Sequence, residues 1–414
     1  MSRPPTVAVV HFPSSGHIRP LLTLVAALER EGLRTVQWAP PEWEQACLAA
    51  GGEFRVLPEF LKTVAWPPPI PSRISEFVGM LAERMAPWMS EQVKDVGADV
   101  VLRDSFAQYG HYAALTNDLR EIVVPPMMAF HRRMRPSAAD LPLTFKNLIK
   151  GVPGALRLRS TSRRLDRQYG APLGDWRTVF GGRHGATTLI WTVPSLQMRP
   201  EALRGEDIRY VGPLRALGPT EVDAEPALDG IDAEDQLIYV SLGTVFEMRP
   251  SFYRDAAAAL AAPGRRVILS IGRVAPEEIG PLPAGVSAHA HVDQLSVLKR
   301  ADLFVAHGGF NGIQESLASG VPMLLFPQMF EQALNADVVV GQGAGLRIRS
   351  ATPDRIHAAA ETLLGDPTYA EAARRVAAEL RSSGGIDEAV EVIASAAREH
   401  RATVDAHMSG PSSD

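Results

Sequence analysis

A chain of 414 residues exceeds the size of one ordinary hydrophobic core, so two domains are expected. The apolar fraction of 46% and the charged fraction of 21% are typical of a globular protein, and the net charge of −5 provides no overall basic surface for nucleic acid. The single cysteine, Cys47, excludes an internal disulfide, and no apolar run is long enough to span a membrane, which together favour a cytoplasmic protein without membrane insertion.

In the first half of the chain, short apolar runs alternate with helical patterns. The runs at 6–11, 34–39 and 98–103 predict buried strands, and apolar residues at helical spacing follow the first of them. Such alternation is typical of parallel strands joined by crossover helices. We therefore expect a Rossmann-like domain over residues 1–215.

A stretch rich in proline, glycine and acidic residues, 216–234, then predicts an interdomain linker. The alternation restarts after it and predicts a second Rossmann-like domain over 235–385, a helix over 386–405 that crosses back to the first domain, and a disordered tail over 406–414. The strands expected in this second domain lie at 237–241, 265–271, 286–290, 303–306 and 322–326. The fold class is therefore α/β, with two parallel sheets that face a central cleft, where ligands bind beyond the carboxyl ends of the strands.

The residues after the strand at 303–306 favour an anion site. A tight glycine-rich turn, His-Gly-Gly-Phe-Asn-Gly over 307–312, leads into a helix expected from Ile313. Free backbone N–H groups at such a helix end favour a diphosphate, to which His307 can donate a hydrogen bond, while Glu315 can accept from ribose hydroxyls. An ordinary turn explains each of these residues singly, but it does not require His307 and Glu315 together.

Residues 286–335 resemble the nucleotide-sugar signature of the family 1 glycosyltransferases, which glycosylate small molecules and use the GT-B fold. P-loop, dinucleotide, nucleophile-elbow and zinc motifs are absent from the sequence. The positions that match the signature in order are Gln294, His307, Gly309, Asn311, Glu315, Gly320, Val321, Pro322, Glu331 and Gln332.

The resemblance implies a role for each matching position. His307 and Thr244 would contact the diphosphate, Glu315 the ribose, and Glu331 with Gln332 the hydroxyls of the donor sugar. His291 would stack on the base, unless it is a plain surface histidine, and Val292 would offer backbone groups to the base. Gly312 replaces the usual Ser or Thr and removes one hydroxyl contact to phosphate. The complete set of expected donor contacts is Gly16, Thr244, His291, Val292, Gln294, His307, Gly309, Phe310, Asn311, Gly312, Glu315, Glu331 and Gln332.

The first strand leads into a loop that carries His17 beside Gly16, before a helix expected near Arg19 and Pro20. The family has its catalytic base at this place, so the resemblance implies that His17 removes the proton of an acceptor hydroxyl. Asp104, at the end of the strand at 98–103, would orient His17. The alternatives are that His17 caps a helix and that Asp104 caps a helix beginning near Ser105.

The acceptor is expected to lie among apolar side chains of the first domain, namely Trp66, Phe77, Met127 and Phe130, although each of them can equally belong to the core. The predicted activity is inverting transfer of a hexose from a UDP- or TDP-linked sugar to a hydroxyl of a polyketide, macrolide or polyphenol. No tightly bound cofactor and no metal are expected, and the chain would act as a monomer or homodimer. The alternatives are a sugar-nucleotide epimerase of the same fold and a non-catalytic, donor-binding auxiliary protein.

Overall fold

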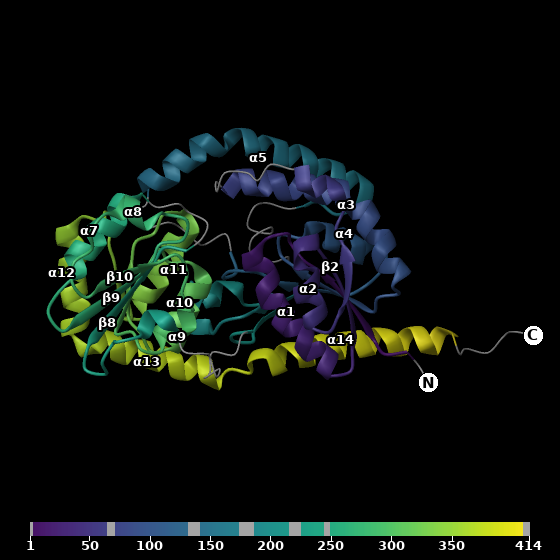
Figure 1. Ribbon diagram of the computed structural model, residues 1–414. Coiled ribbons are helices and arrows are strands. Elements are labelled where there is room, and N and C mark those ends of the chain that lie inside the picture. Colours follow the sequence, from purple (N-terminus) through teal and green to yellow (C-terminus); the bar gives the residue numbers. More distant parts are fainter. Residues whose placement is uncertain are drawn as a thin grey trace, which may run out of the picture.

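A computed structural model describes residues 3–63, 71–130, 141–173, 186–214, 225–243 and 249–408. Within these ranges the strands form two parallel sheets that stand side by side, each with helices around it (Figure 1). This arrangement confirms the predicted fold class.

The first sheet has the strand order β3-β2-β1-β4-β5-β6-β7. Its strands are β1 (Thr6–Val10), β2 (Arg34–Ala39), β3 (Glu53–Val56), β4 (Val100–Asp104), β5 (Glu121–Val124), β6 (Thr187–Ile190) and β7 (Ile208–Tyr210). The helices in this half are α1 (Ser15–Arg30), α2 (Glu44–Ala49), α3 (Pro71–Asp95), α4 (Gln108–Thr116) and α5 (Leu141–Tyr169).

The second sheet has the order β10-β9-β8-β11-β12-β13. Its strands are β8 (Gln236–Ser241), β9 (Arg265–Ser270), β10 (Val286–His289), β11 (Leu303–Ala306), β12 (Met323–Leu325) and β13 (Gly345–Arg347). The helices here are α7 (Pro250–Leu260), α8 (Pro276–Ile279), α9 (Gln294–Leu298), α10 (Phe310–Ala318), α11 (Phe330–Gly341), α12 (Pro353–Gly365) and α13 (Pro367–Ser382), followed by α14 (Gly385–Met408).

Both sheets reverse their strand order once, between β1 and β4 in the first sheet and between β8 and β11 in the second. Chain segments that leave these neighbouring strands diverge to opposite faces of the sheet and open a crevice at the carboxyl edge. The segments after these four strands are therefore the places where the fold itself favours a ligand site.

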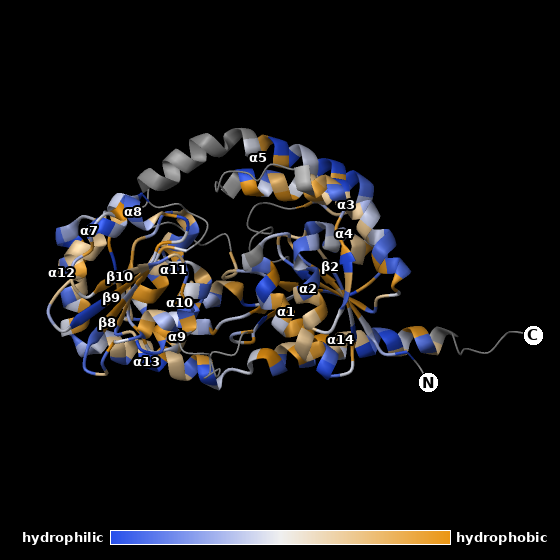
Figure 2. Ribbon diagram, in the orientation of Figure 1, coloured by the Kyte–Doolittle hydropathy of each residue, from blue (hydrophilic) through white to orange (hydrophobic). Residues whose placement is uncertain are grey.

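The central strands are buried along nearly their whole length because helices cover both faces of each sheet. Every residue of β1 and of β4 is buried, and in β8 only Gln236 is partly exposed. Figure 2 shows the same division, with hydrophobic colour on the strands and on inward-facing helix residues and hydrophilic colour on the outer surfaces.

The last helix, α14, runs beneath the first sheet and contacts α1 and β4 (Figure 1). Ile393 and Ala397 of this helix are buried in the same core as β1. The helix does cross back, but it continues to Met408, so residues 406–408, expected in the disordered tail, are helical. Residues 409–414 and the first part of the expected linker, 216–224, lie outside the described residues, and the proposed domain boundaries remain predictions.

Three helix starts differ from the expectation. Helix α1 begins at Ser15 and not near Arg19, because the Ser14 carbonyl already accepts from the N–H groups of His17 and Ile18, both at 3.0 Å. Helix α10 begins at Phe310 and not at 313. The helix after β4 begins at Gln108, so Asp104 is not its N-cap.

Candidate active site

A cavity of about 380 Å³ lies where the two sheets face each other. One wall comes from the first sheet's segments and includes Gly16, His17 and Met127, and the opposite wall comes from the ends of β8, β10, β11 and β12 and the segments that follow them. The residues of that opposite wall include Ser241, Gly243, His291, Val292, Gln294, His307, Gly309, Phe310, Asn311, Gly312 and Glu331. Both crevices created by the strand reversals therefore open into the same cavity.

His17 and Asp104 form a hydrogen-bonded pair on the first wall. The His17 Nδ1 atom lies 2.8 Å from Asp104 Oδ2, and the two side chains are 15% and 2% exposed. The other carboxylate oxygen, Oδ1, accepts from the Phe106 N–H at 2.7 Å. Because a carboxylate can only accept, this pairing assigns the proton to Nδ1 and leaves Nε2 with a free lone pair. The expected base and its orienting carboxylate thus lie together.

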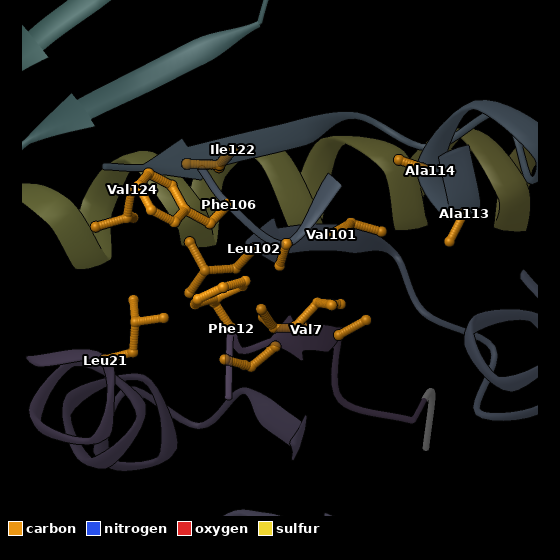
Figure 3. Close-up of a cluster of buried hydrophobic side chains, with 14 of the residues drawn as sticks. Val7, Phe12, Leu21, Val101, Leu102, Phe106, Ala113, Ala114, Ile122 and Val124 are labelled. Atoms are coloured by element: carbon orange, nitrogen blue, oxygen red, sulfur yellow. The ribbon is translucent and has the colours of Figure 1, made fainter. Parts of the chain in front are cut away.

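Two aromatic rings fix the plane of the His17 imidazole. The ring centroids of Phe12 and Phe106 lie 5.0 and 4.8 Å from that of His17, and the two phenyl rings pack edge to face at 5.3 Å. Both phenylalanines belong to the buried core beside β1 and β4 (Figure 3). Tilted packing of this kind leaves the imidazole little freedom to rotate.

The phosphate turn, residues 307–309, connects β11 to α10 on the second wall. Phe310, Asn311 and Gly312 form the first turn of α10, where backbone N–H groups lack partners within the helix and can meet an anion. Burial lowers the pKa of His307 to about 4, an effect that the Ser241 backbone only partly offsets, so its imidazole is neutral at physiological pH.

Two glycines make room for the His307 ring. A Cβ atom at Gly309 would lie 2.6 Å from the His307 Nε2, and one at Gly243 would lie 2.8 Å from Cε1. Gly243 also has a φ of +76°, which L side chains rarely adopt. The imidazole can therefore occupy this position only because neither neighbour carries a side chain.

A chain of three polar side chains stands beside the phosphate turn. Gln294 donates through Nε2 to Glu315 at 2.6 Å, and the Tyr239 hydroxyl donates to Gln294 Oε1 at 3.4 Å. Gln294 lines the cavity, whereas Glu315 lies behind it and is buried. His291 is exposed where it meets the cavity, and the Val292 side chain packs into the core of the second sheet.

The first turn of α11 supplies the far end of the cavity through Glu331. Its carboxylate accepts from the Asn335 Nδ2 at 2.6 Å. Burial raises the pKa of Glu331 to about 7, although the hydrogen bond from Asn335 acts in the opposite direction. The next residue, Gln332, does not line the cavity, because its Oε1 accepts from the backbone N–H groups of Gln328 and Met329 and so caps α11.

The chain is similar in sequence and in structure to several known proteins. A family profile described as the C-terminal domain of erythromycin biosynthesis protein CIII-like proteins matches residues 255–395. Oleandomycin glycosyltransferase of Streptomyces antibioticus is 28% identical over 94% of this chain and 90% of its own length. NDP-glycosyltransferase YjiC of Bacillus subtilis (strain 168) is 26% identical over 92% of this chain and 95% of its own. The solved structure of the glycosyltransferase of kitacinnamycin superposes with a TM-score of 0.80, at 29% identity, over 96% of this chain and 100% of that one.

The chain is thus similar along nearly its whole length to bacterial glycosyltransferases that act on natural products. It is therefore an enzyme that transfers sugar residues, and neither the epimerase nor the auxiliary-protein alternative is favoured. The expected donor residues His291, Val292, Gln294, His307, Gly309, Phe310, Asn311, Gly312 and Glu331 line one cavity, whereas Glu315 and Gln332 do not, and their roles remain predictions.

Of the expected acceptor residues that the structure describes, only Met127 lines the cavity. Phe77 and Phe130 are instead buried in the core of the first sheet. Phe77 packs edge to face on Phe12 at 6.4 Å, so it supports the wall behind His17. Trp66 and the expected phosphate contact Thr244 lie outside the described residues.

Several residues of the cavity were not predicted from the sequence. They include Pro126, Tyr239, Ser241, Gly243 and Ser270. Ser241 and Gly243 could have been found, because they end or follow the strand at which the second sheet reverses its order. Pro126 and Ser270 do not lie next to a strand at which a sheet reverses its order, so nothing in the sequence marks them as cavity residues.

Among the residues that the structure describes, no three His, Cys, Asp or Glu side chains are grouped as a metal site would require. None of the helices in this part of the chain has the length and hydrophobicity to cross a membrane. The expectations of a metal-independent reaction, a cytoplasmic location and a monomer or homodimer stay predictions.

Proposed function

We propose that this glycosyltransferase moves a hexose from a UDP- or TDP-linked sugar to a hydroxyl of a small apolar natural product, with inversion at the anomeric carbon. The observation that carries the proposal is the placement of the His17–Asp104 pair and the phosphate turn on opposite walls of one cavity. The relatives named for oleandomycin and kitacinnamycin support a natural-product acceptor.

The proposed donor site uses groups that are already oriented. The diphosphate meets the first-turn N–H groups of α10 and the neutral imidazole of His307, and the ribose meets Gln294 with Glu315 behind it. Preorganised donors of this kind stabilise the charge that develops on the leaving diphosphate without further rearrangement.

The proposed chemical step is a single displacement. The Nε2 atom of His17 takes the proton of the acceptor hydroxyl while that oxygen forms a bond to the anomeric carbon. The bond from that carbon to the diphosphate oxygen breaks, and its electron pair leaves with the nucleotide. Asp104 stabilises the imidazolium through the 2.8 Å hydrogen bond to Nδ1. Inversion follows because the base and the leaving group face the sugar from opposite walls.

His17→Ala tests the role of the base. We expect kcat to fall by about 10²–10⁴-fold, which is the usual contribution of a positioned general base, while the dissociation constant of the nucleotide sugar stays nearly unchanged. Asp104→Asn should also lower kcat, because the amide can reverse the tautomer of His17. Rates are to be measured by mass spectrometry across UDP- and TDP-glucose with macrolide and polyphenol acceptors.

His357→Ala is the matched control, since His357 is exposed on α12, where its Nδ1 lies 3.0 Å from the Ala259 carbonyl and 4.0 Å from Glu361 Oε1. Its kcat should equal that of the wild type. Unchanged turnover in His17→Ala would contradict the assignment of the base. A product whose anomeric proton coupling in NMR shows the donor's configuration would contradict the single displacement.

A further inference from the structure

One buried amide joins the two ends of the donor site. Asn335, in α11, is 2% exposed, and its Nδ2 donates both to Glu331 Oε1 at 2.6 Å and to the Gly308 carbonyl at 2.9 Å. An amide nitrogen has two hydrogens, so these two bonds use its full donor capacity. Asn335 lies one helical turn after Glu331, which places both side chains on the same face of α11.

The Gly308 carbonyl belongs to the phosphate turn, and α11 packs directly on this turn. A Cβ atom at Gly308 would lie 2.9 Å from the Gln332 carbonyl oxygen, and Gly308 has a φ of +88°. Since no side chain separates the turn from the helix, a displacement of either one alters the distance that the Asn335 amide bridges. The two hydrogen bonds of Asn335 therefore couple the position of the Glu331 carboxylate to that of the phosphate turn.

The environment of the Glu331 carboxylate determines whether it is charged. It lines the cavity, where the titratable neighbours are His17 of α1, His307 of the phosphate turn, His291 after β10 and Tyr239 of β8. Its charged form is opposed by burial and favoured by the hydrogen bond from Asn335. A charged carboxylate forms stronger hydrogen bonds to hydroxyls than a neutral one, so the amide bond affects how well Glu331 can hold a sugar.

We infer that Asn335 is a positioning residue that holds the Glu331 carboxylate toward the hydroxyls of the donor sugar and ties it to the turn that binds the diphosphate. This inference rests on the proposed function, because it takes Glu331 to face the sugar. Asn335 itself does not line the cavity, and it acts through Glu331 and Gly308.

The test separates sugar binding from nucleotide binding. The dissociation constant of TDP divided by that of TDP-glucose is measured by calorimetry between pH 5 and pH 9, with UDP and UDP-glucose in parallel. In the wild type this ratio should rise as Glu331 ionises. In Asn335→Leu, which keeps the branching of the side chain and removes both N–H groups, the midpoint should move up by about one pH unit, the size expected for one lost hydrogen bond to a charged group.

Two further variants make the result specific. In Glu331→Gln the ratio should not depend on pH in this range, and adding Asn335→Leu to it should leave the ratio unchanged. Asn335→Ser, which retains one hydroxyl donor, should give an intermediate midpoint. Asn117→Leu is the matched control, because Asn117 also donates two hydrogen bonds, to the Ser90 and Ala113 carbonyls, but lies far along α4 from the cavity.

The outcomes decide between this inference and the proposed function. If Asn335→Leu weakens TDP and TDP-glucose equally with no shift of the midpoint, Asn335 only supports the fold and the inference is wrong. If Asn335→Leu does not fold, the intermediate midpoint of Asn335→Ser decides, and a wild-type midpoint in that variant would overturn the inference. If the wild type binds none of the nucleotide sugars, the proposed function fails and the inference fails with it.

Discussion

Gly312 is the residue at which the chain departs from the family signature. A Cβ atom there would meet Phe304 Cε1 at 3.6 Å and Gln294 Nε2 at 3.8 Å, which are ordinary contacts. Gly312→Ser should therefore fold, and its hydroxyl, in the first turn of α10, should gain a hydrogen bond to the diphosphate. We expect the dissociation constant for TDP or UDP to fall about fivefold, corresponding to ~1 kcal/mol.

Gly312→Ala separates the hydroxyl from the backbone effect of replacing glycine, which by itself stabilises a helix by about 0.5–1 kcal/mol. Calorimetric titration of both variants with the nucleotide is the measurement. Equal gains in affinity for Ser and Ala would show that the hydroxyl makes no phosphate contact.

For single residues, the sequence predicted which positions lie near the site more reliably than it predicted where their side chains point. His17 and Asp104 could be placed together from the sequence because His17 follows a buried central strand and Asp104 ends another, and such ends meet at one sheet edge. The orientation of Gln332 could not be predicted, because only the structure reveals that its amide oxygen accepts from two backbone N–H groups. Phe77 likewise had two possible environments, and the core of the first sheet is the one it occupies.

At the scale of elements, the phosphate turn leaves little room for a side chain at Gly309. Replacing Gly309 by Ala would place a Cβ atom 2.6 Å from the His307 Nε2, so the ring must move and the start of α10 with it. Because both groups face the diphosphate, we expect nucleotide affinity to fall by about tenfold or more, equal to ~1.4 kcal/mol.

Gly341→Ala is the control for this change, since nothing lies within 4 Å of a Cβ atom at Gly341, at the end of α11. Affinity for UDP or TDP should be unchanged in that variant. A Gly309→Ala enzyme that binds nucleotide as tightly as the wild type would contradict the packing described for His307.

The strands show which elements a sequence can reveal. β2 and β11 have the predicted bounds, and the other central strands differ by one or two residues, because strands buried on both faces are continuous apolar runs. Strands β3, β5, β6, β7 and β13, each of three or four residues, were not predicted. Such short segments acquire strand structure from the neighbour to which they pair, as when Ile190 of β6 aligns with Tyr210 of β7.

At the scale of the whole molecule, the contacts between the two halves include two that lie far apart in the chain. Helix α14 passes beneath the first sheet (Figure 1), where Arg398 and Glu31 form an exposed ion pair at 2.8 Å. Exposed pairs of this kind contribute about 0–1 kcal/mol, so the apolar face of α14 with Ile393 and Ala397 supplies most of the attachment. The second junction lies at the cavity itself.

That second junction is Phe310. It is the first residue of α10, yet its ring is only 6% exposed and belongs to the core of the first sheet, with its centroid 6.1 Å from that of Trp191, which follows β6. The helix proposed to face the diphosphate is thus anchored in the half of the molecule that carries His17. We expect this anchor to set the distance between His17 and the phosphate turn.

Phe310→Ala should therefore have two effects, a loss of about 3 kcal/mol in the free energy of unfolding and a larger fall in kcat than in nucleotide affinity. Phe252→Ala provides the comparison, because Phe252 is also 6% exposed but packs on Phe326 at the far side of the second sheet. Urea unfolding should give similar losses for the two variants, whereas kcat of the folded enzyme should fall only for Phe310→Ala. Equal kcat values in the two variants would mean that Phe310 contributes stability alone and that the distance between His17 and the phosphate turn is set elsewhere.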